Sequence, residues 1–375
     1  MWYCHANIFT PRGFIRGAFE VKDGRFTDVR EGESPVCGAM DLEGAKVVPG
    51  LVDIHTHGNS GADFSDGSPE GLERMARYLA KQGITSFAPT SMTLPYDTLS
   101  AAFATAKALR EHRPKDCARL AGIHMEGPFF SEKKKGAQNA AYLKAPDFPA
   151  FEALYNGCGG LVRIVDVAPE LDGAVDFARN AAALCTVSVA HTNADYAAAG
   201  AVFDAGATHV THLFNAMPPI HHREPGVIGA ASERDSVVAE LICDGHHVHP
   251  SAVRMAFKLF PGRLCLISDA LRCCGMPDGA YELGGQTVYL GGNVARLADG
   301  GIAGSATNLF ECLKNAVRFG VSEEEALRAA TILPARQIGA DGQIGSIETG
   351  KIADFVVCDD GLDAREIYME GIRIY

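Results

Sequence analysis

Eight short apolar segments, most of them separated by helix-like stretches, constrain the fold of this chain more than any other feature. They cover residues 47–55, 84–89, 120–126, 162–168, 187–191, 208–212, 238–244 and 264–269. Apolar strands that alternate with helices are typical of a parallel sheet covered by helices on both faces. Eight such units in 375 residues predict an α/β fold, the (β/α)8 TIM barrel. An open doubly wound sheet is the alternative, but it requires a glycine-rich phosphate turn after the first strand, which this chain lacks.

The stretches between these strands carry signals for the start and end of helices. Ser68 and Pro69 open a run that ends at Gly83, which predicts an N-cap serine, a first-turn proline and a C-terminal glycine. Similar patterns predict helices over residues 95–112, 194–205 and 250–260.

The two ends of the chain have a different, β-rich pattern. Residues 19–26 predict a hairpin whose turn is Asp23-Gly24, and the C-terminal segment is β-rich again. Two β-rich ends that flank one barrel most simply pair with each other. We therefore expect a small β-sandwich domain built from residues 1–46 and 341–375, and a catalytic barrel built from residues 47–340.

Composition excludes several classes of protein. Apolar residues make up 47% of the chain and the mean hydropathy is +0.02, which excludes disorder, and no apolar stretch is long enough to span a membrane. A formal charge of −12, from 34 basic and 46 acidic residues, argues against nucleic acid or an anionic membrane as a partner. The eleven cysteines form no CxxC pair and no signal peptide is recognisable, so we expect a cytoplasmic protein with reduced thiols.

Potential metal ligands stand at the ends of five of the predicted strands. They are His55 and His57, Glu126, His191, His212 and Asp269. The carboxyl ends of barrel strands converge on one face, where active sites lie, so we expect these six side chains to meet. Histidines and carboxylates around an open position are typical of a hydrolytic divalent-metal centre, in which the metal polarises a carbonyl and lowers the pKa of a water molecule. Asp269, alone on the last strand, is the candidate proton shuttle.

Several motifs resemble the amidohydrolase superfamily and, within it, the N-acetylglucosamine-6-phosphate deacetylases. They cover residues 49–58, 122–129, 190–192, 211–217, 223–226, 244–248 and 267–269, and residues 345–354 resemble the superfamily's return to its β-sandwich. His-x-His is shared by many amidohydrolases, whereas Glu126-Gly-Pro and the motif at 212–217 are far more specific. The resemblance implies hydrolysis of the acetamide of N-acetyl-D-glucosamine 6-phosphate to D-glucosamine 6-phosphate and acetate, in amino-sugar catabolism and cell-wall recycling.

The resemblance also implies the metal ligands. It assigns the main metal to Glu126, His191 and His212, a second metal to His55 and His57, and a ligand role besides the proton shuttle to Asp269. One or two divalent cations per subunit follow, with zinc the most favoured metal and iron, manganese or cobalt as alternatives. Strand 162–168 contains no lysine. This argues against relatives such as dihydroorotase and hydantoinase, which bridge their metals with a carboxylated lysine there.

Substrate contacts are implied in the same way. Arg223 and His247 match positions that bind the sugar phosphate, a group that suits a guanidinium fork and an imidazole. Asn215 and Ala216 are expected to offer main-chain amides to the same group. In the resembled family the arginine reaches across from a neighbouring subunit, which implies a homodimer in which Arg223 completes the partner's active site.

Gln138 departs from the family pattern, which has a histidine near the sugar at this position. A neutral amide does not titrate and binds no metal, but it can hydrogen-bond a hydroxyl, so Gln138 stays among the predicted substrate-binding residues. The alternative substrates are N-acetylgalactosamine 6-phosphate, another N-acyl amino-sugar phosphate or an N-acyl amino acid. A non-catalytic binding or assembly relative is the alternative of another class, but such proteins lose ligands and all six are present here.

Overall fold

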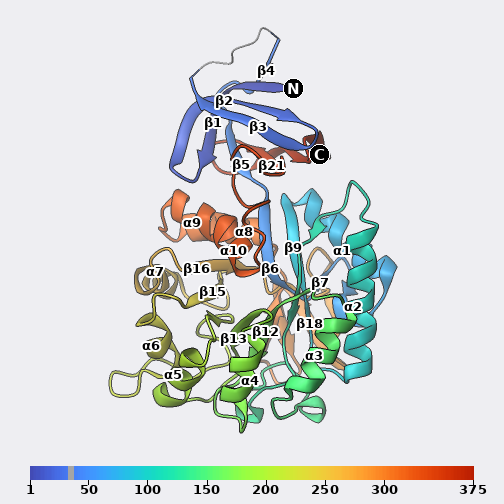
Figure 1. Ribbon diagram of the computed structural model, residues 1–375, viewed down its shortest axis with the longest axis vertical. Helices are drawn as coiled ribbons and strands as arrows, with labels where there is room; N and C mark the ends of the chain where they lie inside the picture. Colours follow the sequence, from blue (N-terminus) through green and yellow to red (C-terminus); the bar gives the residue numbers. More distant parts are fainter. Residues whose placement is uncertain (33–37) are drawn as a thin grey trace.

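The predicted strands lie side by side around a barrel in the computed structural model, which describes residues 1–32 and 38–375 (Figure 1). In spatial order they are β6 (Leu51–Thr56), β9 (Ile84–Ser91), β11 (Ile123–Met125), β12 (Val162–Val167), β13 (Thr186–Val189), β14 (His209–Val210), β15 (Val238–Ile242) and β16 (Leu264–Ile267), and the short β10 (Arg119–Leu120) also pairs with β9. All of these pairings are parallel. A bridge between Thr56 and Ala270 returns the last strand to the first. The TIM-barrel prediction is confirmed.

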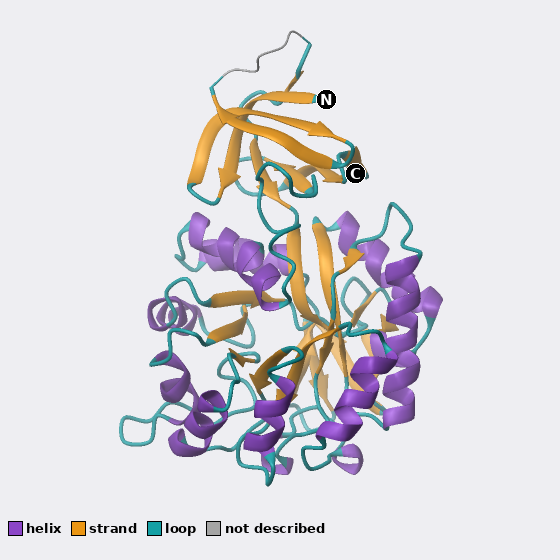
Figure 2. Cartoon of the chain, viewed as in Figure 1, coloured by secondary structure: helices purple, strands orange, loops and turns teal. Residues whose placement is uncertain are grey.

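Helices surround the barrel (Figure 2). They are α1 (Pro69–Lys81), α2 (Tyr96–Glu111), α3 (Phe148–Gly157), α4 (Ala174–Ala181), α5 (Tyr196–Asp204), α6 (Gly226–Ser232), α7 (Pro250–Leu259), α8 (Leu309–Arg318), α9 (Glu323–Ala330) and α10 (Ile332–Gln337), with single 3-10 turns at Phe64–Asp66, Glu132–Lys134 and Ala140–Tyr142. Ser68 caps α1 as predicted, because its side chain accepts a hydrogen bond from the Gly71 amide at 3.0 Å. Over the described residues, no helix is long and apolar enough to cross a membrane.

The interior of the barrel is apolar toward the amino ends of its strands and polar toward their carboxyl ends. The apolar layer is formed by Val52, Ile54, Ala88, Ile164, Cys265 and Ile267, and residues from α10 and the segment after it, Leu333, Ala335, Ile338 and Ile344, pack against it. These side chains close the amino end. The next inward-facing positions carry buried polar groups, among them His124, Asp166 and Glu240, which lie directly under the residues predicted to bind metal.

The two chain ends form one curled sheet beside the barrel (Figure 1). Its strands are β1 (Trp2–Thr10), β2 (Gly13–Lys22), β3 (Arg25–Glu31), β4 (Met40–Asp41), β5 (Lys46–Pro49), β21 (Phe355–Cys358), β22 (Ala364–Met369) and β23 (Ile372–Arg373). The predicted Asp23-Gly24 hairpin is confirmed, since β2 and β3 pair antiparallel with Lys22 opposite Arg25. Aromatic rings from the two ends meet inside: Phe19 lies 5.1 Å from Phe355, centroid to centroid. This contact makes the sheet a sandwich around an aromatic core.

The predicted first strand is in fact two strands that belong to different sheets. β5 pairs with β1 and β21 in the terminal sheet, whereas β6 pairs with β9 in the barrel. Gly50 separates them, and a Cβ at this residue would lie 2.1 Å from the Thr85 side-chain oxygen. Only glycine lets the chain pass so close to β9. The chain therefore enters the barrel at Gly50, a few residues later than expected.

A further small sheet near the carboxyl end of the barrel was not predicted. It is a four-stranded antiparallel meander of β17 (Gly279–Leu283), β18 (Gln286–Gly291), β19 (Val294–Leu297) and β20 (Ile302–Ser305), and a two-stranded ribbon of β7 (Gly58–Asn59) and β8 (Ala62–Asp63) follows the first barrel strand. The meander follows the strand that carries Asp269, and Leu283 and Ile302 line the pocket at this end of the barrel. It therefore supplies an apolar wall next to the predicted metal site.

Candidate metal centre and active site

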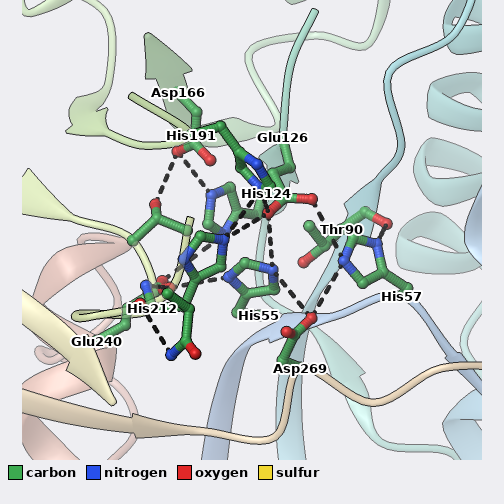
Figure 3. Close-up of polar contacts among 12 residues, drawn as sticks. His55, His57, Thr90, His124, Glu126, Asp166, His191, His212, Glu240 and Asp269 are labelled. Atoms are coloured by element: carbon green, nitrogen blue, oxygen red, sulfur yellow. Dashed lines mark hydrogen bonds and ion pairs between the residues drawn. The ribbon is translucent and has the colours of Figure 1, made fainter. Parts of the chain in front are cut away.

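The six residues predicted to bind metal converge at the carboxyl end of the barrel (Figure 3). They arrive from separate strands: His55 on β6, Glu126 after β11, His191 after β13, His212 after β14 and Asp269 after β16, with His57 just beyond β6. All six are buried or nearly so, with side-chain exposures between 0% and 12%. The barrel thus brings into one place residues that are spread over more than half of the sequence.

Glu126 occupies the centre of the cluster. Its Oε1 lies 3.2 Å from Nε2 of both His191 and His212 and 3.5 Å from Nε2 of His55. Its Oε2 faces Nε2 of His57 at 3.4 Å. Asp269 approaches the His-x-His pair from the other side, with Oδ1 at 3.5 Å from His55 Nε2 and 3.3 Å from His57 Nε2. The Glu126 carboxylate is therefore common to two groups of donors.

The backbone at three of the strand ends adopts an unusual conformation. His191, His212 and Asp269 have φ angles of 42°, 31° and 48°, in the left-handed region that L-residues other than glycine avoid. Each such residue costs about 1–2 kcal/mol. Surrounding hydrogen bonds hold Asp269 in place, because its amide donates to His55 O at 2.9 Å and its carbonyl accepts from the Ser305 amide at 2.8 Å. Strain of this kind concentrates at functional sites.

The electrostatics of the cluster favour positive charge between its carboxylates and imidazoles. Burial raises the pKa of Glu126, but hydrogen bonds from His191 and His212 outweigh it and hold that pKa well below its usual range. Burial lowers the pKa of His57, yet Asp269 and Glu126 outweigh it and raise the value to about 9. In the same way, Glu126 raises the pKa of His212 to about 9 against the effect of burial. A cation would satisfy these carboxylates in place of the protons.

The ring nitrogens that face away from the cluster have fixed partners. His57 Nδ1 donates to Thr90 O at 3.2 Å, and His191 Nδ1 donates to Lys134 O at 2.9 Å. His55 Nδ1 donates to the Glu240 carboxylate at 2.8 Å. Each bond keeps a proton on Nδ1, so that Nε2, which faces Glu126, is the nitrogen that would bind a metal once its own proton is displaced. The three imidazoles are thus held in the tautomer that binds metal.

The donor set fits divalent cations. Two groups of three ligand atoms, one from His55, His57 and Glu126 and one from Glu126, His191 and His212, each lie within 4.8 Å of one another. His55 Nε2 is buried and has no hydrogen-bond partner among the described residues. A buried polar atom without a partner is costly, and a metal at this point removes the cost. Mixed histidine and carboxylate donors suit zinc and other first-row transition metals.

A cavity of about 190 Å³ opens above the cluster. It is lined by His57, Glu126, His191, His212 and Asp269, by the predicted substrate contacts Gln138, Asn215, Ala216 and His247, and by an apolar wall of Met92, Leu271, Leu283, Ile302 and Ala303, with Gly136 and Ala137. His55 lies beneath and does not line it. Among the described residues, no lysine or arginine lines this cavity. One wall is therefore apolar and the floor carries the residues predicted to bind metal.

The predicted contacts on the β14 and β15 side differ in what they offer. His247 Nδ1 bonds to Asp244 at 2.7 Å, which leaves Nε2 as the free ring nitrogen. The main-chain amide of Asn215 donates to His212 O at 2.9 Å. This amide already closes the turn after His212, and Asn215 lines the cavity, so its contact with the substrate stays a prediction. In the described structure the Ala216 amide has no such bond, so it is available as the predicted donor.

Gln138 is engaged by the protein itself. Its side-chain nitrogen donates to Glu126 Oε2 at 2.6 Å, and its side-chain oxygen accepts from the Thr93 amide at 2.8 Å. Gln138 is only 2% exposed. It therefore orients the central carboxylate directly, in addition to lining the cavity where a substrate hydroxyl was expected to bind.

Arg223 lies outside the cavity of its own chain. It is exposed, on the short turn between His221 and Glu224, and its guanidinium approaches His222 Nε2 at 2.7 Å. Its side chain pairs with no carboxylate among the described residues. This placement separates Arg223 from the other predicted site residues.

Three buried polar residues beneath the metal cluster were not predicted. Glu240 Oε2 accepts from His55 Nδ1 and from the His212 amide, at 2.8 and 3.2 Å. His124 donates to Ile54 O at 3.0 Å and to Asp166 at 2.9 Å. Each stands between two apolar residues of its strand, and an ionisable residue in such a place is rarely buried without a partner. An ionisable residue between apolar neighbours was the sequence signal for these three buried groups, but it does not show which residues they contact.

The comparison with known families agrees with this geometry. The sequence model of the amidohydrolase family matches residues 46–371. The chain belongs to the amidohydrolase family. This amidohydrolase is 36% identical to the N-acetylglucosamine-6-phosphate deacetylase of Vibrio furnissii, across 100% of the chain and 92% of the relative. It is 37% identical to the N-acetylgalactosamine-6-phosphate deacetylase of Escherichia coli O157:H7, across 86% of each chain.

Solved structures extend the likeness to the whole amidohydrolase chain. The N-acetyl-D-glucosamine-6-phosphate deacetylase of Mycobacterium smegmatis superposes with a TM-score of 0.94 at 32% identity, covering 100% of this chain and 100% of that one. An alanine variant of the same enzyme, in complex with N-acetyl-D-glucosamine-6-phosphate, gives the same TM-score. The predicted family and fold class are confirmed by these matches.

Proposed function

We propose that this amidohydrolase hydrolyses the acetamide of N-acetyl-D-glucosamine 6-phosphate to D-glucosamine 6-phosphate and acetate. The observation that carries the proposal is the cluster of four histidines, Glu126 and Asp269 at the floor of one cavity. Relatives named as deacetylases of amino-sugar phosphates, at 36% to 40% identity, support the choice of substrate. We place the activity in amino-sugar catabolism, as the named relatives imply, and in the cytoplasm, where the free cysteines of the described part would stay reduced.

The cluster offers places for two cations. Glu126, His191 and His212 would hold one, and His55 and His57 with the same carboxylate would hold the other, with zinc our first choice of metal. When bound, such a metal lowers the pKa of a water molecule and polarises the amide carbonyl. The chain holds these ligands rigidly through the carbonyls of Thr90 and Lys134 and the carboxylate of Glu240.

Asp269 carries the proton in this scheme. Its Oδ1 faces His55 and His57 and its side chain borders the cavity, so it is within reach of a water molecule at the metal ligands and of an amide bound in the cavity. Asp269 accepts the proton of the attacking water and donates it to the nitrogen as the carbon–nitrogen bond breaks. The apolar wall formed by Leu271 and Leu283 borders the same cavity and excludes bulk water from these charges.

We also propose that the phosphate is bound jointly by two copies of the chain. The cavity offers one imidazole, His247, but neither lysine nor arginine among its described lining residues. A phosphate in an otherwise acidic protein of charge −12 needs a stronger cation. Arg223, exposed and without a carboxylate partner in the described structure, supplies it from a second subunit, which makes the enzyme a homodimer.

Mixing two defective variants tests the shared site. Asp269→Asn removes the proton shuttle and Arg223→Ala removes the phosphate contact, so each homodimer is impaired. In a mixed dimer, one site contains Asp269 of its own chain and Arg223 of the partner. Random re-association should therefore restore about one quarter of wild-type activity at low substrate concentration. No recovery, with mixed dimers shown by mass spectrometry, contradicts the shared site; a monomer in light scattering does so too.

Acetate release tests the reaction itself. We expect turnover of N-acetylglucosamine 6-phosphate by enzyme with about two metals per chain in elemental analysis, loss of turnover on chelation, and recovery with zinc. The galacto epimer is the second candidate substrate, favoured by the relative from E. coli O157:H7 and by glutamine at position 138. Activity on the epimer alone would assign that function instead. Inactivity on both compounds in the metal-loaded enzyme would overturn the proposal.

A further inference from the structure

A second cavity lies at the opposite end of the barrel from the metal cluster. Its volume is about 300 Å³, and four arginines line it together with apolar residues: Arg110, Arg113, Arg119, Arg163, Ile338, Ile344 and Ile352. Arg119 begins β10 and Arg163 is the second residue of β12, whereas Arg110 and Arg113 lie at the end of α2 and just after it. The arginines thus gather where strands begin, while the metal ligands gather where strands end.

Carboxylates neutralise only part of this charge. Glu370 accepts hydrogen bonds from Arg113 and from Arg119, the latter at 2.7 Å. Asp354 lies 3.8 Å from Arg119. Over the part of the chain that the structure describes, Arg110 and Arg163 have no ion pair and no side-chain hydrogen bond. The cavity therefore holds an excess of positive charge within a protein whose net charge is −12.

Packing holds Arg163 in position, whereas Arg110 is exposed at the rim of the cavity. The Nε atoms of Arg119 and Arg163 are buried and have no hydrogen-bond partner in the described structure. The stem of Arg163 packs against Gly122, where a Cβ would lie 2.3 Å from Arg163 Cγ. Burial lowers the pKa of Arg110, and repulsion from Arg163 and Arg119 lowers it further. Like charges and unsatisfied donors are both costly, and an anion in the cavity relieves both costs.

We propose that this cavity is a binding site for a small phosphorylated anion, with Arg110 and Arg163 as its principal contacts. Several guanidinium forks around one point match the oxygens of a phosphate better than those of a single carboxylate. The isoleucine walls reduce the local dielectric and strengthen the interaction. The volume accommodates inorganic phosphate or the phosphate end of a phosphorylated sugar. This inference does not depend on the proposed deacetylase activity.

Titration calorimetry with inorganic phosphate tests the site, in an Arg223→Ala background so that the phosphate contact proposed for the active site is weakened. We expect phosphate to bind this protein, and the Arg110→Gln/Arg163→Gln substitutions to weaken binding at least tenfold. A matched control, Arg179→Gln/Arg318→Gln, removes two exposed arginines from α4 and α8 and should bind like the background. Equal affinity in the double variant and its control, or no uptake of phosphate at millimolar concentrations, would overturn the proposal.

Two further measurements identify the ligand and check the fold. If inorganic phosphate is the ligand, glucosamine 6-phosphate should bind the cavity no more tightly than inorganic phosphate does. A tenfold higher affinity for glucosamine 6-phosphate would identify a sugar phosphate as the ligand. Without phosphate, the double variant should melt no lower than its control, because substitution removes charge repulsion. With phosphate, only the control should gain Tm. A phosphate-induced gain of equal size in both proteins contradicts the assignment.

Discussion

The two ends of the barrel are built from the same strands but serve different purposes. At the carboxyl ends, imidazoles and carboxylates crowd around Glu126 on strained backbone, with His191, His212 and Asp269 at positive φ. At the amino ends, Leu333 and other apolar residues close the barrel with regular packing. The carboxyl end thus accepts strained backbone and buried charge for chemistry, whereas the apolar layer at the amino end supplies stability.

The largest effect is expected from a substitution at the carboxyl end of the barrel, where the proposed chemistry takes place. Asp269→Asn keeps the size of the side chain but removes the proton acceptor, so kcat for acetate release should fall by about 10³-fold. Circular dichroism and thermal unfolding should remain close to wild type, because Asp269 packs little apolar surface. Near-normal turnover in this variant would show that another group carries the proton.

A substitution at the amino end should have the opposite profile. Leu333→Ala removes a buried side chain of α10 from the layer that closes the barrel, which should lower the free energy of unfolding by about 2–4 kcal/mol. The kcat at 25 °C should stay within about twofold of wild type, since the metal cluster lies at the other end. Urea unfolding together with steady-state kinetics checks both values. A large loss of kcat in the folded variant would mean that the two ends are coupled.

Glu240→Gln probes the layer between the two ends. The amide oxygen can still accept from His55 Nδ1, but the negative charge that strengthens this ligand is lost. Affinity for the metal at the His-x-His pair should fall about 10- to 100-fold, while the metal at His191 and His212 is retained. Elemental analysis after dialysis against a weak chelator measures this directly. Unchanged loading at both positions would reduce Glu240 to a packing role.

The smallest expected effect concerns the ion pairs at the amino end. Burial raises the pKa of Glu370, but Arg119 and Arg113 outweigh it and lower that pKa overall. Because this pKa is lower in the folded state than in the unfolded state, where it is about 4.3, the ionised carboxylate stabilises the fold above pH 4.3. The stabilisation is lost as the pH falls through the folded-state pKa. Glu370→Gln should therefore lower the free energy of unfolding by about 1 kcal/mol at pH 7, because partly exposed ion pairs contribute little more than this. The difference between wild type and variant should vanish in acid, below the folded-state pKa. Urea unfolding of the two proteins at pH 7 and in acid measures this difference.

Local patterns were sufficient for much of the fold and for the selection of candidate metal ligands. The eight strands and the Asp23-Gly24 hairpin follow from hydrophobic patterning and turn chemistry, which act between neighbours in sequence. His55, Glu126 and Asp269 were identifiable because a barrel requires strand ends to converge. The split at Gly50 was not identifiable, because it depends on pairing with strands far away in the sequence. The meander at 279–305 was also missed, although its Gly284-Gly285 turn was a signal for a hairpin.

What the sequence alone determined was the barrel, the β-rich character of the two chain ends and the six candidate metal ligands, since periodicity and residue type encode these directly. Only the tertiary structure decided which partner each polar group has. Gln138 turns out to hold Glu126, the Asn215 amide turns out to be occupied, and Arg110 and Arg163 meet across a cavity. Hydrogen bonds and charge clusters depend on distances in space of a few ångströms. Residues from different strands and helices reach those distances only after the chain has closed into the barrel.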